Sequence, residues 1–221
     1  MGKLYDVITF DCYGTLVDWE SGIAAAFSAA GVRAGVPVDV PAALRAYAEI
    51  EPAVQAEAYR KYRDVLAETA RRVCARLGWA LSDADAGFLA ESMAGWRPFP
   101  DTNGALTRLA ADHALGILSN VDEDLLAETR RLLAVDFDPV ITAEQVRSYK
   151  PGQAHFTAAR ARIGERRWLH AAQSYFHDVT PARSLGIATA WINRKTERSP
   201  DGGAPDIEAL DLDAFADWVC G

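Results

Sequence analysis

Four polar clusters in this sequence combine residue types that could do chemistry, and each follows an apolar run. They contain Asp11, the pair Ser119 and Asn120, Lys150, and Asp178. A carboxylate beside a lysine stays ionised because the opposite charge favours its charged form, and an ionised carboxylate can act as a nucleophile. The serine and asparagine could donate hydrogen bonds to a substrate anion. Asp178 could hold the lysine in place, or bind a metal ion or water.

Short, β-rich apolar runs alternate with helical segments along much of the chain. The predicted strands cover residues 4–10, 114–118, 139–142, 168–172 and 187–192, and the last of these is the final clear strand. Strands that alternate with helices form a parallel, doubly wound sheet, and parallel strands end at one common edge. The sequence therefore predicts a Rossmann-like α/β core with all four polar clusters at the carboxyl edge of its sheet.

The stretch after the first strand has a different character, because it is rich in alanine and has helical spacing almost throughout. Pro41 suits the first turn of a helix, Pro52 marks a break or kink, and Gly78 suits a helix end. Four or five helices are expected, forming a lid over the sheet edge. The predicted domains are an α/β core, 1–18 and 97–221, and an inserted helical cap, 19–96.

Composition excludes several classes of protein. The 221 residues include 23 Lys and Arg against 31 Asp and Glu, for a formal charge of −8, and half are hydrophobic. This is the profile of a globular protein, and the acidic balance argues against nucleic-acid or anionic membrane partners. Residues 1–6 carry no apolar run of a signal peptide, and no apolar stretch is long enough to span a membrane. Three distant cysteines without a CxxC motif fit a cytoplasmic protein without disulfides.

The polar clusters resemble the four motifs of the haloacid dehalogenase (HAD) superfamily. The segment 10–18 (FDCYGTLVD) resembles the first motif, 118–120 (LSN) the second, 148–151 (SYKP) the third and 177–178 (HD) the fourth. Their order and spacing match across nearly the whole chain. The likeness is closest to the type II 2-haloacid dehalogenases, whose members carry a helical cap between the first two motifs.

This resemblance implies a cofactor-independent hydrolase that displaces halide from the α-carbon of a small 2-haloacid, a carbon–halide chemistry of (S)-2-haloacid dehalogenase type. Asp11 would attack C2 and form an ester, which water would then hydrolyse at the Asp11 carbonyl. Lys150 would steady Asp11, and Asp178 would orient Lys150 or the water. The substrate-binding candidates are Tyr13, Thr15, Ser119, Asn120, Ser174 and His177. The family is often dimeric, although the sequence shows no interface directly.

Two departures from the family patterns bear on the reaction. HAD phosphatases place a second Asp two residues after the nucleophile to protonate the leaving alkoxide, and here that position is Tyr13. Tyr13 therefore favours carbon–halogen or similar cleavage over the alternative, a phosphatase with Mg²⁺ held by Asp11 and Asp178. The usual Ser-Ser-Asn run is replaced by residues 173–175 (QSY), and His177 could be a pocket residue or a structural one. A catalytically silent module that binds a partner through its cap is a further alternative.

The cap bears on which substrate is bound. Dehalogenases of this group cradle the departing halide with an Arg and aromatic residues, for which the candidates are Arg45, Tyr47, Arg60, Tyr62 and Arg63. The same region carries Glu49 and Glu51, which would suit a cationic group. Residues 19–20 and 99–102 also resemble azetidine-2-carboxylate hydrolases, which open a strained ring amine through the same aspartyl ester. Our hypothesis is that Glu49 or Glu51 faces the cleft and distinguishes these substrates.

Overall fold

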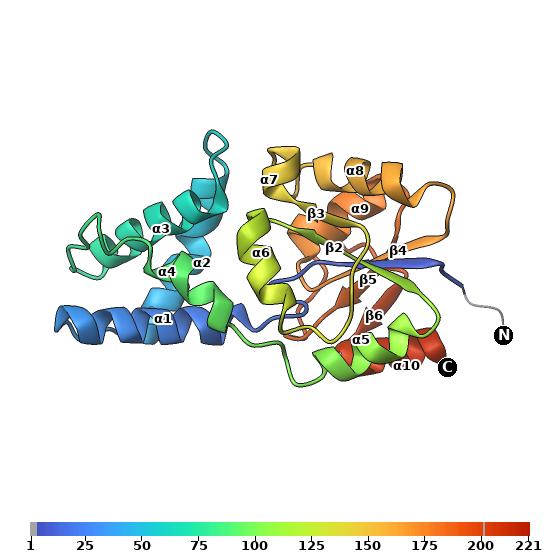
Figure 1. The fold of residues 1–221 in the computed structure, drawn as a ribbon, viewed down its shortest axis with the longest axis horizontal. Helices are drawn as coiled ribbons and strands as arrows, with labels where there is room; N and C mark the ends of the chain where they lie inside the picture. The colour runs from blue at the N-terminus through green and yellow to red at the C-terminus, as the bar shows by residue number, and fades with distance from the viewer. Residues whose placement is uncertain (1–3, 201) are drawn as a thin grey trace.

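A computed structural model describes residues 4–200 and 202–221, in which six strands form one sheet (Figure 1). The strands are β1 (Val7–Phe10), β2 (Ala114–Ser119), β3 (Val140–Thr142), β4 (Trp168–Ala172), β5 (Ala188–Ile192) and β6 (Ile207–Ala209). Their order across the sheet is β3-β2-β1-β4-β5-β6, and every neighbouring pair is parallel. The predicted doubly wound α/β fold is therefore confirmed.

The prediction that 187–192 is the last strand is wrong, because β6 follows it. In β6 only Ile207 and Ala209 are buried, while Glu208 between them is exposed. Three residues are too few for alternation to show as a pattern in the sequence. The preceding segment 194–205 forms no helix or strand in its described part, and Asp201 within it lies outside the described residues, as do residues 1–3.

The two faces of the sheet are covered by different helices because β1 is buried on both sides. All four β1 residues are buried, as expected for a central strand of a parallel sheet. Val7 belongs to the cluster under α8 (Ala154–Ile163) and α9 (Thr180–Ser184). Ile8 and Phe10 belong to the cluster under α5 (Thr102–Ala110) and α10 (Leu212–Cys220). In Figure 1 these helix pairs lie above and below the sheet, with α6 (Glu123–Arg130) and α7 (Ala143–Val146) nearer its edge.

The helices of residues 19–96, called the helical block here, stand beside the sheet edge in Figure 1. They are α1 (Trp19–Ala34), α2 (Val40–Gln55), α3 (Tyr62–Arg76), α4 (Phe88–Ser92) and the 3₁₀ turn η1 (Met93–Gly95). Pro41 lies in the first turn of α2, as predicted. Gly78 follows the end of α3 with a φ of 75°, also as predicted.

Of the break or kink predicted at Pro52, the break is wrong, because α2 continues through the proline to Gln55. Proline lacks the N–H that would bond to residue 48, but its φ suits a helix. The helix therefore runs on for three residues beyond it. Asp18 and Asp39 cap α1 and α2 by accepting the backbone N–H groups of Ser21 (3.1 Å) and Ala42 (3.0 Å).

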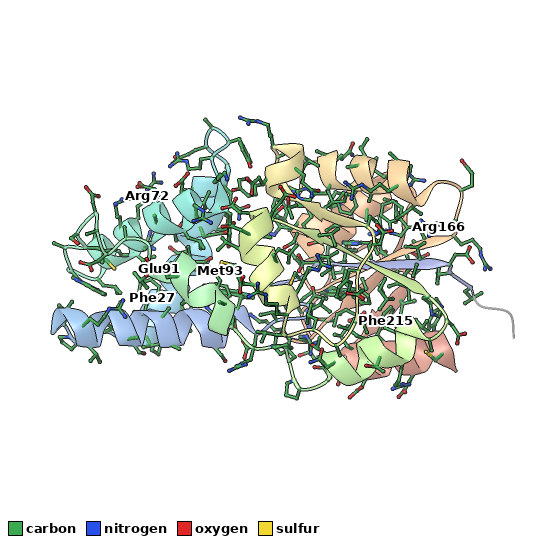
Figure 2. The ribbon with its side chains drawn as sticks, viewed as in Figure 1. Phe27, Arg72, Glu91, Met93, Arg166 and Phe215 are labelled. Carbon is green, nitrogen blue, oxygen red and sulfur yellow. The ribbon has the colours of Figure 1, made fainter. Side chains whose placement is uncertain are left out.

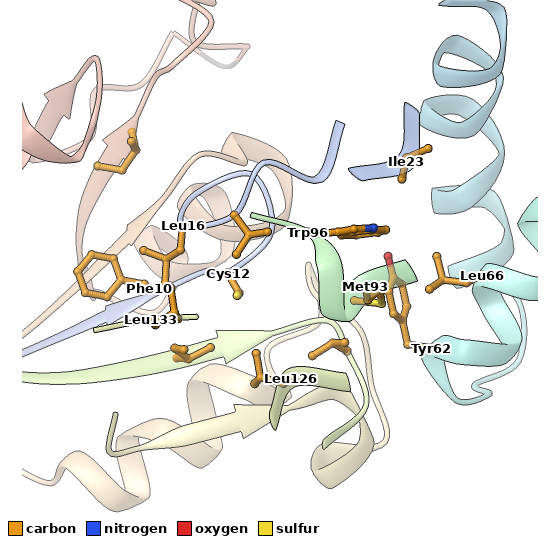
Figure 3. Close-up of a cluster of buried hydrophobic side chains, with 14 of the residues drawn as sticks. Phe10, Cys12, Leu16, Ile23, Tyr62, Leu66, Met93, Trp96, Leu126 and Leu133 are labelled. Carbon is orange, nitrogen blue, oxygen red and sulfur yellow. The ribbon is translucent and has the colours of Figure 1, made fainter. Parts of the chain in front are cut away.

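One apolar cluster joins the sheet to the helical block. It runs from Phe10 and Leu16 through Trp96 and Met93 to Leu66 (Figure 3). Each part also has its own aromatic contacts. Phe27 meets Phe88 at 5.1 Å between ring centroids among the block helices, and Phe215 meets Phe10 at 6.2 Å beneath the sheet (Figure 2 labels Phe27 and Phe215). The block is thus packed firmly against the edge where the strands end.

Two chain segments connect the block to the sheet and lie side by side. The N–H of Asp18 donates to the carbonyl of Arg97 at 2.9 Å, and Val17 forms a bridge with Pro98. All three cysteines are free, with Cys12 and Cys74 buried and Cys220 exposed. Within the described ranges, none of the helices combines the length and apolarity needed to cross a membrane.

Candidate active site

Asp11 lies directly after β1, where the connections to the two neighbouring strands leave in opposite directions. β1 pairs with β2 on one side and with β4 on the other, so Asp11 sits at the switch point of the sheet. Ligands bind at such points in open α/β sheets because the strand ends diverge there. The N–H of Asp11 donates to the carbonyl of Ala171 at 3.1 Å, which ties the residue to the neighbouring strand.

Lys150 brings the two predicted catalytic carboxylates together. Its Nζ donates to Asp11 Oδ1 at 2.9 Å, to Asp178 Oδ1 at 2.6 Å and to the carbonyl of Leu118 at 2.8 Å. All three bonds are buried, and the Lys150 side chain is 1% exposed. An unpaired ammonium at this depth would be costly, so the two carboxylates and the carbonyl complete its coordination. The structure therefore joins Asp11, Lys150 and Asp178 in one network.

The two carboxylates share one cation, and their acidities differ accordingly. Burial raises the pKa of Asp11, and the ammonium of Lys150 offsets part of that rise. Burial also acts on Asp178, but Lys150 and His170 outweigh it and lower the pKa of that carboxyl to about 2. Burial alone would lower the pKa of Lys150, yet Asp11 and Asp178 raise it above its usual range. Lys150 is thus a fixed positive charge between them.

His170 is a member of this network that sequence reasoning missed. Its Nε2 lies 2.9 Å from Asp178 Oδ1, and its Nδ1 lies 2.8 Å from Thr9 Oγ1. The only signal in the sequence is a polar residue inside an apolar strand, which by itself indicates no partner. His170 therefore orients Asp178 from within β4.

Thr15, predicted to bind substrate, supports the carboxylate of Asp11 and is not among the residues that line the cavity. Its Oγ1 donates to Asp11 Oδ2 at 2.9 Å and accepts the N–H of Gln173 at 2.9 Å. The turn that makes this contact needs Gly14, whose φ is 99°. A side chain there would be strained and would also meet Trp19 at 3.2 Å. The hydroxyl of Thr15 is thus already committed to the nucleophile.

Ser119 and Asn120 both reach the cavity, but they differ in what they can offer. The amide of Asn120 holds the backbone of Lys150, accepting its N–H at 2.7 Å and donating to its carbonyl at 3.0 Å. By contrast, Ser119 Oγ is buried and has no hydrogen-bond partner within the described chain. Since buried hydroxyls are usually paired, this one is available to a substrate oxygen.

A cavity of about 260 Å³ lies between the sheet edge and the helical block. Among the predicted substrate-binding residues, Tyr13, Ser174 and His177 also line it. The Tyr13 hydroxyl is bonded to Thr129 Oγ1 at 2.8 Å, and His177 Nδ1 lies 3.0 Å from Ser174 Oγ. Ser174 caps η2 (Tyr175–Val179), a short π-helical turn that carries both His177 and Asp178.

The helical block supplies an aromatic wall but no arginine. Tyr47 and Tyr62 line the cavity, as two of the cradle candidates, and their hydroxyls are 3.2 Å apart. Trp19 and Trp96 complete the wall. The three arginine candidates are absent from the lining, because Arg45 is exposed and the others are held by acidic partners, Arg60 by Glu57 and Arg63 by Asp122 and Asp124.

Glu51 is the acidic residue that the block turns into the cavity, whereas Glu49 points to solvent and pairs with Arg76 at 2.5 Å. Glu51 is 8% exposed and accepts a hydrogen bond from Gln55. Burial raises the pKa of Glu51 to about 7, although hydrogen bonds from Gln55 and Tyr62 act in the opposite direction. Helical spacing alone could not choose between the two glutamates.

The fold and the Asp–Lys–Asp network define a hydrolase of the HAD class. The family model described as haloacid dehalogenase-like hydrolase matches residues 5–179, and the chain belongs to this family. An (S)-2-haloacid dehalogenase of Pseudomonas putida is 28% identical over 226 residues, covering 96% of each chain.

Two solved structures show the same fold. A defluorinating L-2-haloacid dehalogenase superposes with a TM-score of 0.86 at 24% identity, covering 98% of this chain and 96% of the other. A second structure is the L-2-haloacid dehalogenase of Xanthobacter autotrophicus with chloropropionic acid covalently bound. It gives a TM-score of 0.83 at 20% identity, covering 98% and 99% of the two chains.

Proposed function

We propose that this hydrolase displaces a leaving group, above all halide, from the α-carbon of a small 2-substituted carboxylic acid. The observation that carries the proposal is the buried Asp11–Lys150 pair facing a cavity of about 260 Å³, beside the unpartnered hydroxyl of Ser119. The 2-haloacid dehalogenase names of the relatives over nearly the full chain support this substrate class.

The proposed reaction proceeds in two steps. An oxygen of Asp11 attacks C2 of the substrate from the side opposite the leaving group, which departs with the bonding electrons. Water then attacks the ester at the carbonyl carbon of Asp11, and the 2-hydroxy acid leaves with an oxygen that came from the aspartate. The fixed charge of Lys150 would hold Asp11 ionised before the first step and favour the oxyanion in the second.

The remaining assignments follow the lining of the cavity. Ser119 would bind the substrate carboxylate, and Tyr13, Ser174 and His177 would shape its pocket. Asn120 and Thr15 would act through Lys150 and Asp11, since their side chains bond to those residues. Residues 19–96 would form the cap domain, and 1–18 with 97–221 the core. A homodimer stays a prediction.

The first test of this proposal is halide release from chloroacetate and from both enantiomers of 2-chloropropionate, with EDTA present. The expected result is metal-independent release that is selective for one enantiomer. No release from any of these substrates would contradict the halide assignment. Azetidine-2-carboxylate, and then a phosphate ester with Mg²⁺, would be assayed next. Inactivity on all of them would favour a silent binding module.

The residues at the sheet edge do not fit the Mg²⁺-dependent phosphatase alternative. The ammonium of Lys150 already lies between the two carboxylates, 2.9 Å from Asp11 Oδ1 and 2.6 Å from Asp178 Oδ1, where a bridging cation would have to sit. Three acidic, histidine or cysteine side chains do not converge on a metal position anywhere in the described chain. Tyr13 also stands where a phosphatase needs its acid, and its hydroxyl is bonded to Thr129.

A ring amine is the second candidate leaving group, and the position of Glu51 favours it. A carboxylate in the cavity wall opposes a departing halide but attracts an ammonium. The aromatic wall suits a cation for the same electrostatic reason, because the face of an aromatic ring is negative. The lining also lacks the arginine that a halide cradle would use. The azetidine-2-carboxylate type of substrate combines such an ammonium with a carboxylate on the α-carbon.

Glu51→Gln is expected to separate the two leaving groups. Because the pKa of Glu51 is about 7, the carboxyl gains its charge as pH rises through neutrality. In the wild type, KM for 2-chloropropionate should therefore rise between pH 6 and pH 8, by roughly fivefold, as two negative charges come together. Glu51→Gln should remove this rise and should weaken turnover of a ring amine.

The matched control is Glu49→Gln, two residues earlier on the same helix, where the side chain is exposed and paired with Arg76. It should retain the wild-type pH dependence of KM. A pH dependence that is the same in the wild type and Glu51→Gln would refute the role of Glu51, whichever substrate the enzyme prefers.

A further inference from the structure

The residue in the N-cap position of α6 uses its side chain elsewhere. Asp122 precedes α6, yet it makes no side-chain cap on that helix. Its Oδ1 accepts the N–H of Tyr62 at 2.8 Å, and its Oδ2 accepts the N–H of Arg63 at 3.0 Å. These are the first two residues of α3, which belongs to the helical block. A carboxylate from the α/β core thus caps a helix of the block.

This cap replaces one that α3 lacks. α1 and α2 are capped by Asp18 and Asp39 from their own chain segments, whereas Lys61 at the N-cap of α3 makes no side-chain cap. The first N–H groups of a helix have no intrahelical acceptor and lie at the positive end of its dipole. A carboxylate that accepts two of them therefore stabilises both the helix end and its place against the core.

Asp122 is buried completely, so its carboxylate depends on protein partners, above all the amides of α3, for its hydrogen bonds. Arg63 Nε lies 3.5 Å from Asp122 Oδ2 and adds a charged partner. If the block moved away, water would hydrate the carboxylate and replace part of what the two amides provide. Losing the contact would therefore cost less than leaving the carboxylate and the two amides without partners.

The capped residue is itself part of the cavity wall. The side chain of Tyr62 lines the cavity, lies 3.2 Å from the hydroxyl of Tyr47 and hydrogen-bonds to Glu51. Its backbone N–H is held by Asp122, two residues beyond Asn120 at the sheet edge. Asp122 thus links the segment after Ser119 and Asn120 to the wall facing them, in addition to the hydrogen bond at 3.3 Å from Asn120 to Gln55 of α2.

We propose that Asp122 is a positioning residue that holds the wall formed by Tyr47, Glu51 and Tyr62 closed over Asp11. This inference rests on the proposed function, because the wall matters for activity only if substrate binds in the cavity. Asp11, Lys150 and Asp178 all lie in the core, so loss of the contact should impair substrate capture more than the chemical steps. Saturating substrate would restore the closed arrangement through its own contacts with the wall.

The test compares Asp122→Ala and Asp122→Asn with the control Asp124→Ala. Asp124 lies on the same turn and also pairs with Arg63, but its side chain is 66% exposed. Asp122→Ala should raise KM for the preferred 2-haloacid about tenfold, while kcat stays within about threefold of the wild type. Asp122→Asn keeps the size and one acceptor, so its KM should be intermediate. The control should match the wild type in both constants.

A second readout does not depend on activity. The amides of Tyr62 and Arg63 should exchange with solvent at least tenfold faster in Asp122→Ala, while those of β1 keep their wild-type rates. A KM within twofold of the wild type in Asp122→Ala would overturn the inference, as would a loss confined to kcat and thermal stability. If the wild type releases no halide, the proposed function fails. Unchanged exchange at Tyr62 and Arg63 would then still refute the contact itself.

Discussion

Asp11→Asn is expected to abolish turnover, with a loss of at least about 10³-fold in kcat/KM. The amide cannot act as the nucleophile, and water alone would have to displace the leaving group. The fold should survive, because Lys150 keeps Asp178 and the carbonyl of Leu118 as partners. Circular dichroism and the thermal midpoint of the variant would check this. Halide release measures the loss.

Isotope labelling tests the aspartyl ester directly in the wild type. In a single turnover in H₂¹⁸O, the label should enter the carboxylate of Asp11, while the product hydroxyl carries the original oxygen of the protein. Mass spectrometry of the peptide that contains Asp11 detects the shift. Label found in the product alone would show direct attack of water on C2. Asp83→Asn, an exposed aspartate outside the cavity lining, serves as the control and should retain full activity.

Lys150→Met should be nearly as damaging, for an electrostatic reason. It removes the cation that Asp11 and Asp178 share and leaves two buried carboxylates facing each other. Breaking a buried ion pair in this way costs about 3–5 kcal/mol of stability. The pKa of Asp11 should rise further, since burial and Asp178 already raise it and Lys150 opposes them. We expect kcat/KM at neutral pH to fall by at least about 10³-fold.

The pH profile distinguishes this explanation from simple unfolding. An acid whose pKa rises needs a higher pH to ionise, so the acidic limb of kcat/KM should move to higher pH in Lys150→Met. Residual activity should therefore recover in part as the solution becomes more alkaline. A folded variant with an unshifted acidic limb would contradict the role given to Lys150. Lys61→Met, which removes the exposed pair with Glu144, should leave the profile unchanged.

The positions of Asp11, Lys150 and Asp178 at one edge of a parallel sheet could be predicted from the sequence. Each follows a short apolar run, and the alternation of strands and helices requires such runs to end at the same edge. The match that confirms the family membership covers residues 5–179, a range that contains all four motifs. The helices of residues 19–96 could also be predicted from the sequence, because helical spacing is a pattern within each short segment.

The sequence could not show which side chains face the cavity from the helical block. Helical spacing places Glu49 and Glu51 on opposite sides of α2. Only the packing of α2 shows that the side of Glu51 is buried and that Glu49 is left with Arg76. Likewise, Arg45, Arg60 and Arg63 have the residue type that could cradle a departing halide, but the structure places none of them in the cavity lining. Arg45 is instead exposed, and Arg60 pairs with nearby Glu57. Arg63 pairs with Asp122 and Asp124, which are distant in the chain.

By itself the sequence determined the class of sheet, the edge that carries the nucleophile and the helical nature of the insertion, because these depend on patterns within short segments. The tertiary structure alone decided that His170 holds Asp178, that Thr15 holds Asp11 and that Asp122 caps a helix some sixty residues earlier. A hydrogen bond between distant residues leaves no local pattern, since either partner alone is an ordinary polar side chain. Only the packing of strands and helices brings the two atoms within bonding distance.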